Sequence, residues 1–247
     1  MFNYEETVRS ELYTWQQKML KPPSSLNRLS RGVQRRMNNL IPDKIHQAIT
    51  TAIRQMTRAV LFGAGYTTRQ PLAHVSFELR EAAVRDRIAI YKKAGAAEGG
   101  VTGAGGILLG LADFPLLLSL KMKMLFDIAA LYGYSVTDYR ERLYIMYIFQ
   151  LAFSSQERRR EVYLQMENWA EHCRELPEDI NQFDWLTFQQ EYRDYIDLAK
   201  MAQLIPGIGA AVGLVVNWRL VGQLGTTAMN AYRMRWRETD FKALNNQ

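Results

Sequence analysis

The stretch GAGGILLGLADFPLLLSL (residues 103–120) decides the fold together with a second stretch, GIGAAVGLVVNWRLVGQL (residues 207–224), that repeats its pattern. The second begins 104 residues after the first, and each is interrupted by one polar side chain at the same place, Asp113 or Asn217. Both are too apolar for surface loops and too interrupted for ordinary membrane spans. We therefore predict that they form two packed helical hairpins at the centre of the fold.

Glycines recur four positions apart in both stretches, and on a helix this leaves a flat strip where another backbone approaches closely. Tight helix packing is the first interpretation, and dipping into a membrane or binding an acyl chain are the alternatives. Because no strand precedes either stretch and no P-loop ending occurs, nucleotide binding is disfavoured. The glycines assigned to close packing are Gly103, Gly105, Gly106, Gly110, Gly207, Gly209 and Gly213.

Asp113 and Asn217 need an explanation because a carboxylate or an amide among leucines is costly unless it is hydrogen-bonded. Both residue types cap helix starts, and Pro115 suits a first turn, so capping is the first interpretation. A contact between the two side chains is the second. A catalytic carboxylate at Asp113 is the third, although no partner base or nucleophile lies near it in sequence.

The composition is that of a globular chain with a basic balance. Of 247 residues, 48% are hydrophobic and 23% are charged, and this length suits one large domain or two small ones. The net charge is +6, with basic ends and an acidic part at about 155–200. A basic surface attracts phosphate, in nucleic acid or in anionic lipid. The single cysteine, Cys173, excludes an intramolecular disulfide and fits a reducing compartment.

The N-terminal residues lack the apolar core of a signal peptide, and no stretch is a convincing transmembrane helix. The longest uncharged run, residues 201–218, contains Pro206 and three glycines, whereas a spanning helix needs about 20 mostly apolar residues. We therefore expect a cytoplasmic protein that is at most peripheral on the inner face of the cell membrane.

Helical periodicity runs through nearly the whole chain, and no useful strand-like alternation occurs, so we predict an all-α, multi-helix bundle. Residues 5–21 form a first helix, Pro42 opens a second, and residues 138–153 are apolar on all sides, as is typical of a central buried helix. The apolar face expected after Pro42 consists of Ile45, Ile49, Ile53, Met56 and Val60.

The remaining boundaries follow from glycine, proline and capping patterns. Residues 94–106 (AGAAEGGVTGAGG) are predicted to be a connector, Gly133 to end the helix before it, and Ser154 with Glu157 to form a capping box for an acidic helix that ends before Pro177. In a helix over residues 72–93, the side chains expected to face inward are Val75, Leu79, Ala82 and Ala83.

No metal site or cofactor site is expected. The histidines are isolated, and the Glu-x-x-His pairs of a di-iron bundle are absent from the sequence. Glu167, Glu171 and Glu175 share one helix face, which we interpret as solvated.

Two basic clusters are candidate contacts for an anionic surface. The first consists of Arg28, Arg31, Arg35 and Arg36, and the second of Arg233, Arg235, Trp236 and Arg237. Arginine beside tryptophan suits the membrane interface, where the ring and the cation both prefer headgroup depth. Ordinary helix surface charge is the alternative. Nucleic acid is disfavoured because no stacking platform or reading helix is evident.

Several segments resemble the EcsC family: Tyr13 and Trp15 with Lys18-Met19, LIPDKIHQAIT (40–50), GGILLGLADFPLLLSLKMKMLFDIAALYGYSV (105–136) and IPGIGAAVGLVVNWRLVGQLGTTAMNAYRMRW (205–236). The resemblance covers nearly the whole chain except the acidic part at about 155–200. We treat that part as a more variable helical insert within a single domain, residues 1–247.

The resemblance implies a bacterial cytoplasmic protein that works at the membrane face, since the family is named from genes beside an ABC transporter linked to protein secretion. It supplies no catalytic residues. We therefore expect a non-enzymatic protein that docks on an anionic membrane surface or on a membrane protein such as an ABC transporter. The alternatives are a binding module for a lipid or apolar small molecule and, further off, a lipid-acting hydrolase centred on Asp113.

Overall fold

The computed structural model describes residues 4–22, 43–62, 71–73, 75–103, 106–184, 186–188 and 210–244. Within these ranges the long elements are all helices and no β-sheet occurs, so the all-α prediction is confirmed. The α-helices are α1 (Tyr4–Leu20), α3 (Asp43–Phe62), α4 (Phe77–Gly103), α5 (Gly106–Leu131), α6 (Tyr139–Phe153), α7 (Gln156–Glu167), α8 (Trp169–Glu175) and α11 (Ala210–Leu244), and a 3-10 turn covers Ile180–Gln182.

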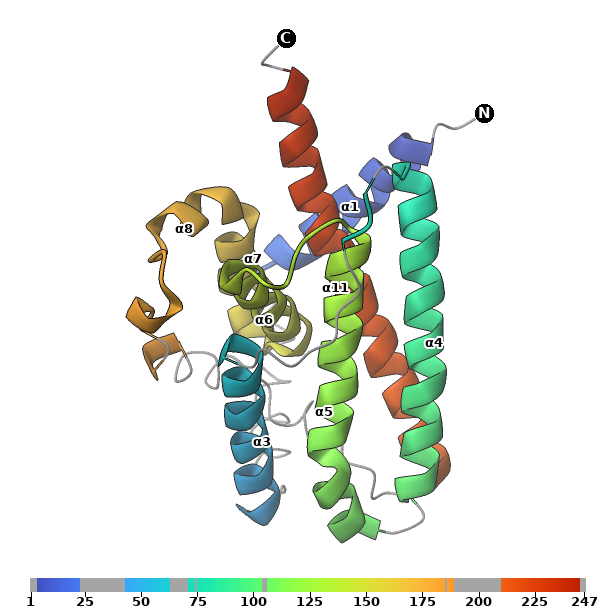
Figure 1. Ribbon diagram of the computed structural model, residues 1–247. Helices are drawn as coiled ribbons and strands as arrows, with labels where there is room; N and C mark the ends of the chain where they lie inside the picture. The colour runs from blue at the N-terminus through green and yellow to red at the C-terminus, as the bar shows by residue number, and fades with distance from the viewer. Residues whose placement is uncertain are drawn as a thin grey trace.

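Helices α4, α5 and α11 lie side by side and form a long layer (Figure 1). Since α4 ends at Gly103 and α5 begins at Gly106, these two helices form an antiparallel hairpin. Helix α11 runs against both and makes its largest contact with α4. Helix α3 packs along α5, while α1 and α7 lie against each other near the opposite end from the α4–α5 turn. In the described part of the chain, no helix is long and apolar enough to cross a bilayer.

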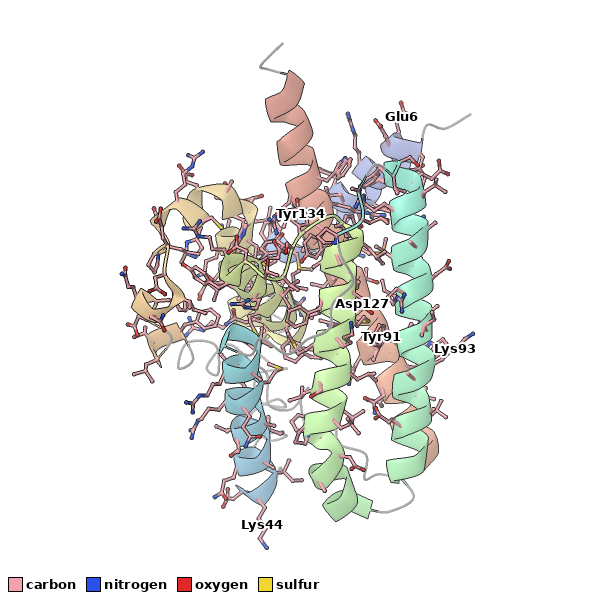
Figure 2. The ribbon with its side chains drawn as sticks, viewed as in Figure 1. Glu6, Lys44, Tyr91, Lys93, Asp127 and Tyr134 are labelled. Carbon is pink, nitrogen blue, oxygen red and sulfur yellow. The ribbon has the colours of Figure 1, made fainter. Side chains whose placement is uncertain are left out.

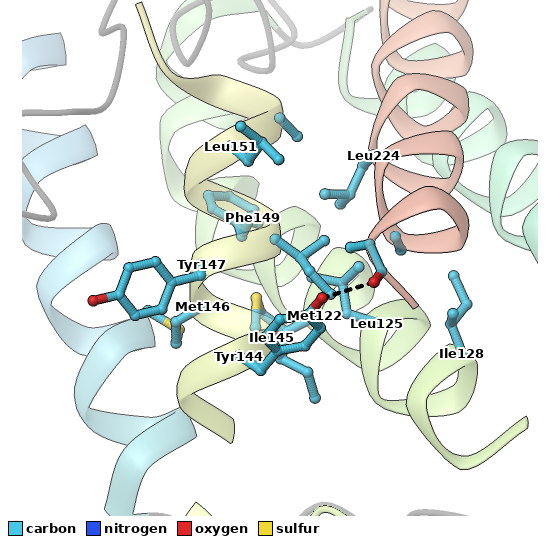
Figure 3. Packing of buried hydrophobic residues seen from close by; sticks show 14 of the residues in the cluster. Met122, Leu125, Ile128, Tyr144, Ile145, Met146, Tyr147, Phe149, Leu151 and Leu224 are labelled. Atoms are coloured by element: carbon cyan, nitrogen blue, oxygen red, sulfur yellow. Dashed lines mark hydrogen bonds between the residues drawn. The ribbon is translucent and has the colours of Figure 1, made fainter. Parts of the chain in front are cut away.

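Helix α6 is the centre of the hydrophobic core, which confirms the prediction for residues 138–153. All of its residues except Arg140 and Arg142 are buried, and Asp138 caps it by accepting a hydrogen bond from the backbone N–H of Arg140 at 2.9 Å. Figure 3 shows Phe149 of α6 among side chains of α5 and facing Leu224 of α11. The apolar face predicted for α3 is also confirmed, because its four later members are buried and the first is partly buried.

The contact between α4 and α11 is close because glycines remove side chains from it. A Cβ atom added at Gly225 would lie 2.8 Å from the side-chain carbons of Ile88, and one added at Gly95 would lie 3.2 Å from Val221. Both distances are shorter than ordinary van der Waals contact: a side chain at position 225 would force Ile88 to move, and one at position 95 would require Val221 to shift by a few tenths of an ångström. The two contacts also fix the register, in which α11 runs antiparallel to α4.

The α4–α5 hairpin is also held by a polar clasp near its middle. The hydroxyl of Tyr91 donates a hydrogen bond to the Asp127 carboxylate at 2.8 Å, as Figure 2 lets the reader follow. Lys123 lies 2.7 Å from the same carboxylate and Arg87 lies 3.8 Å from it. The buried aspartate of α5 therefore joins the two arms of the hairpin through Tyr91 and Arg87 of α4, whereas Lys123 belongs to its own helix.

Two predictions about the glycine-rich stretches are wrong. Residues 210–224 belong to the single continuous helix α11, so the second stretch is no hairpin, and residues 207–209 lie outside the described part. The predicted connector at 94–106 is helical up to Gly103, the last residue of α4. Tertiary packing outweighs the low helix propensity of glycine here, because Gly95 lies between Leu120 of α5 and Val221 of α11.

The inward face predicted for residues 72–93 is wrong for Leu79 and Ala82, whereas Val75 is partly buried and Ala83 packs against the core. Leu79 is 64% exposed and Ala82 is exposed, whereas Arg80 and Glu81 are buried. The periodicity of apolar residues predicted that other residues of this helix face the core. The structure places these charges inside because Glu81 meets Arg233 of α11, so an ion pair decides which face of α4 is buried.

At the other boundaries, one prediction is confirmed and one is wrong. Gly133 follows the end of α5 with a φ of 91°, the left-handed conformation expected of a C-terminal stop. The capping box is wrong, because the Ser154 hydroxyl donates back to the carbonyl oxygen of Gln150 at 2.6 Å, within the last turn of α6. The acidic helix is also broken, since α7 ends at Glu167 and α8 follows.

Replacing Gly225 with alanine is expected to destabilise the protein. The added methyl group overlaps Ile88, and overpacking costs about 1–3 kcal/mol, against a gain of about 1 kcal/mol from helix propensity. Gly222→Ala is the matched control, because its nearest neighbours are the terminal atoms of Lys92 at 3.4–3.6 Å, which can move. Urea denaturation measures both free energies of unfolding. Equal stability of the two variants would contradict the close contact.

Candidate functional site

Asp113 and Asn217, the polar residues of the two glycine-rich stretches, lie inside helices and not at helix starts. Asp113 is two turns into α5, and Asn217 is two turns into α11. Interior residues have no free backbone N–H groups beside them, so the capping interpretation is wrong for both. Pro115 also lies inside α5.

Asn217 is the most unusual polar residue of the core. Its side chain is 0% exposed, and within the described part of the chain neither its Oδ1 nor its Nδ2 atom has a hydrogen-bond partner. The expected hydrogen bond to Asp113 is therefore wrong. A buried amide without partners costs about 1–3 kcal/mol, so this position lowers the stability of the fold.

Lys121 is a buried charge that sequence reasoning missed, and it lies near the level of Asn217. Lys121 is 1% exposed, and its Nζ atom donates a hydrogen bond to the carbonyl oxygen of Leu117 at 3.4 Å. Gly95 of α4 lies against Leu120 of α5 and Val221 of α11, so these three residues are at the same height in the three-helix layer. One helical turn closer to the α4–α5 connection, the corresponding residues are Glu98, Leu117 and Asn217. We call Glu98, Lys121 and Asn217 the polar layer.

The pKa shifts in the polar layer have burial as their main cause. Burial lowers the pKa of Lys121 to about 8, and the charge of Glu98 opposes that shift. Burial raises the pKa of Glu98, which the charge of Lys121 lowers and the charge of Asp113 raises. Asp113 therefore lies near the carboxyl group of Glu98, and no nucleophile is described beside it. This arrangement gives no support to hydrolysis at Asp113.

Exposed apolar side chains gather at the same end of the layer, on α5 and on α11. Leu116 of α5 is 57% exposed, and Val215 and Trp218 of α11 are 63% and 40% exposed. Their exposed neighbours are Ala112, Pro115 and Ser119 on α5 and Leu214 on α11, and Arg219, one turn beyond Val215, is an exposed charge at the edge of the α11 face. We call these two faces the apolar strips. They lie in the half of each helix nearest the α4–α5 turn (Figure 1).

Cationic side chains border the apolar strips. The Nζ atom of Lys92 lies 4.4 Å from the centre of the Trp218 ring, and Arg219 beside it is exposed. Lys44, in the first turn of α3, lies at the same end of the molecule (Figure 2). An aromatic ring with a cation over it combines apolar area with positive charge, as side chains at a membrane interface do.

The second predicted basic cluster lies elsewhere and has a structural role. Arg233 is 4% exposed, and its Nε and Nη2 atoms donate to the two carboxylate oxygens of Glu81 at 2.6 and 2.7 Å. Glu81 also accepts hydrogen bonds from Tyr4 at 2.7 Å and Tyr132 at 3.0 Å. The prediction that Arg233 contacts an anionic membrane surface is wrong, because a buried carboxylate holds its guanidinium group.

Arg235 and Trp236 are likewise engaged inside the protein. Arg235 lies 2.7 Å from Glu141 and 3.8 Å from the centre of the Tyr134 ring, so it too serves a buried carboxylate. Trp236 packs on Phe77 with ring centroids 4.9 Å apart. The membrane-contact prediction is therefore wrong for these residues as well, because neighbours on other helices already hold them. The side chain of Arg237 lies outside the described residues.

Other predicted residues lie partly or wholly outside the description. Arg28, Arg31, Arg35, Arg36, Gly105, Gly207 and Gly209 lie outside the described ranges. Gly103 ends α4, Gly106 and Gly110 belong to the first turns of α5, and Gly213 to the first turn of α11. For these glycines, close packing stays a prediction. Among the described residues, no group of three His, Cys, Asp or Glu side chains is placed to hold a metal ion.

Replacing Asn217 with leucine is expected to stabilise the protein by about 1–3 kcal/mol, because it removes a buried amide without partners and keeps a similar volume. Asn230→Leu is the matched control. Asn230 is also buried, but its amide donates to the carbonyl oxygen of Thr226 at 3.0 Å and accepts from Arg233 at 3.3 Å, so its loss should destabilise. Thermal and urea unfolding measure both changes. Destabilisation by both variants would show that Asn217 has partners.

Lys121→Met is expected to change how stability depends on pH. The folded pKa of about 8 lies below the usual 10.5, so above pH 8 the unfolded chain binds more protons at this lysine and stability rises with pH. Between pH 7 and 9.5 this rise amounts to about 1–2 kcal/mol in the wild type and is absent in Lys121→Met. Urea unfolding at both pH values measures it. Parallel curves for the two proteins would place the Lys121 amine in water.

Comparison with known proteins supports the resemblance found in the motifs. The family model described as "EcsC protein family" matches residues 6–236. Protein EcsC of Bacillus subtilis (strain 168) is 41% identical over 231 residues, which cover 93% of this chain and 95% of that protein. The uncharacterized protein YdbA of the same organism is 29% identical over 139 residues, or 56% of this chain and 51% of that protein. No solved structure matches. The family model matches most of the chain, and the Bacillus subtilis EcsC protein is similar over nearly its whole length. The chain therefore belongs to the EcsC protein family.

Proposed function

We propose that this protein is a non-enzymatic, peripheral component of the cytoplasmic membrane face that docks on anionic lipid with the apolar strips at its glycine-rich end. The observation that carries this proposal is the exposure of Leu116, Val215 and Trp218, beside which the acidic side chain of Asp113 on α5 is only partly exposed. Side chains of this size are usually covered, and groups of them on an exposed face indicate an interaction surface.

The depth of the proposed contact follows from the helix geometry. No described helix can cross a bilayer, but an amphipathic surface needs only to enter the boundary between headgroups and acyl chains, about 5–10 Å deep. The strips cover about two turns of α5 and a little over one turn of α11, which suits such a shallow contact. Insertion of the strips buries apolar area without unfolding either helix.

The charges near the strips favour an anionic surface. Lys92, Arg219 and Lys44 lie near them, and the whole chain has a net charge of +6. Each basic side chain near an anionic leaflet contributes about 1 kcal/mol, and added salt screens this contribution. The lysine over Trp218 keeps its amine toward water while the ring enters the interface.

A membrane protein is the alternative partner for the same strips. The family resemblance implies an ABC transporter, and a transporter would place this chain at the same membrane face. The two partners are separable because protein-free vesicles offer lipid alone. Binding to such vesicles supports the lipid proposal, and its absence would assign the strips to a protein.

Val215→Glu is expected to weaken binding to vesicles of phosphatidylcholine and phosphatidylglycerol by about tenfold. The change removes about 1–2 kcal/mol of apolar transfer free energy and adds a charge that anionic lipid repels. Co-sedimentation at low and high salt measures the binding. Val215 is 63% exposed, so the folded protein tolerates glutamate there.

Leu79→Glu is the matched control for this experiment. Leu79 is 64% exposed, close to the 63% of Val215. It lies in the first turn of α4, at the opposite end of the layer. The same charge is introduced on an equally exposed apolar residue, so this variant should keep wild-type binding. Equal losses in the two variants, or no binding of the wild type to anionic vesicles, would overturn docking through the apolar strips.

A further inference from the structure

A groove of about 630 Å³ lies between α1, α4 and α11, and one of its lining residues, Lys92, also reaches the apolar strips at Trp218. Its volume is within the range of about 300–1,000 Å³ that small-molecule sites occupy. Helix α1 forms one wall with Glu11 and Lys18, α4 contributes Arg85 and Lys92, and α11 forms the rest.

The groove has an excess of positive charge. Four cationic side chains line it, Lys18, Arg85, Lys92 and Arg233, against the carboxylate of Glu11 in the lining and that of Glu81 behind it, which pairs with both arginines. Within the described residues, Lys18 has no carboxylate at ion-pair distance, and it is exposed. Its amine therefore adds positive charge to a concave space without an acidic partner.

The floor of the groove is apolar. Trp15, Ile88 and Met229 line it and are at least 91% buried, while hydroxyl groups of Ser10 and Thr226 lie on its walls. Apolar walls with few polar groups orient a ligand, and they strengthen electrostatic attraction by excluding water. The groove suits a ligand that carries both an anionic group and an apolar part.

Arg233 presents a fixed anion-binding group at the edge of the groove. Glu81 holds its Nε and Nη2 atoms from behind, and the Nη1 atom donates to Glu11 at 2.9 Å. The side chain of Glu11 is 58% exposed, whereas that of Glu81 is 0% exposed. Glu11 is therefore the replaceable partner, and its carboxylate occupies a position that another anion can take.

We propose that this groove binds the phosphate group of an amphiphilic ligand, with Lys18 and Arg233 as its cationic contacts. A lipid headgroup and a free phosphate compound share this chemistry. The ligand's phosphate replaces the Glu11 carboxylate at Arg233, and its apolar part lies on the floor formed by Trp15 and Met229. Neither of these two contacts belongs to the apolar strips, and binding of a dissolved ligand requires no bilayer.

The test uses the full chain and three dissolved probes: dihexanoylphosphatidylglycerol below its micelle concentration, glycerol phosphate, and inorganic phosphate. Isothermal titration measures each affinity. Lys18→Gln should weaken binding by about fivefold, since one charge pair at contact distance in water corresponds to about that factor. Glu11→Gln should strengthen binding by a similar factor, because the competing carboxylate is lost while Glu81 still holds Arg233.

Lys93→Gln is the matched control, because Lys93 follows Lys92 in α4 but points away from the helix layer (Figure 2). It should leave all affinities unchanged. Tighter binding of the lipid probe than of the two phosphates assigns the groove to a headgroup, and equal binding assigns it to a free phosphate compound. No saturable binding of any probe below about 10 mM, equal effects of Lys18→Gln and Lys93→Gln, or weaker binding in Glu11→Gln would each overturn the proposal.

These outcomes are distinct from those of the vesicle experiment. Binding of the dissolved probes without binding of vesicles would support the groove proposal and contradict membrane docking. Binding of vesicles that depends on Val215, without binding of any probe, would support membrane docking and contradict the groove proposal.

Discussion

The buried ion pair between Glu81 and Arg233 holds together the helices on which the rest of the structure depends. Burial alone would raise the pKa of Glu81, but hydrogen bonds from Arg233 and Tyr4 outweigh it, and the pKa lies below its usual value. The carboxylate thus stays charged near neutral pH and joins α4 to α11, to α1 through Tyr4, and to the residue after α5 through Tyr132. Loss of one partner would leave a buried charge uncompensated, which typically costs about 3–5 kcal/mol.

The two ends of the three-helix layer are held by different forces. The end with Arg233 is fixed by charge pairs of good geometry, whereas the other end relies on close backbone contact at Gly95 and contains the polar layer. Asn217 and Lys121 both lower stability there, one as an amide without described partners and the other as a desolvated amine. Local stability is therefore lower where the apolar strips lie. The proposed membrane contact lies at this less stable end, and the proposed anion site lies toward the end that the ion pairs hold.

The sequence predicts the elements whose causes are local. Helix α6 is apolar on all sides, α3 has a regular apolar face, and Gly133 marks a helix end through its own backbone. The buried polar residues, in contrast, depend on partners that are distant in the sequence. Glu81 and Arg233 are 152 residues apart, and nothing in the local pattern of either shows that the other neutralises it. The burial of Lys121 could not be predicted for the same reason, because it depends on how α5 packs against the other helices. Its position within a long apolar helix was the available signal.

Lys92 connects the two proposed surfaces. It lines the groove, and its stem passes Gly222, where a Cβ atom would lie 3.4 Å from it, so that its amine reaches Trp218. Along α11, Arg233 and Trp218 are about 22 Å apart at 1.5 Å per residue, too far for one phosphate to touch both. The glycine at position 222 gives the lysine this path, so the close packing of α4 and α11 also sets where charge meets apolar surface.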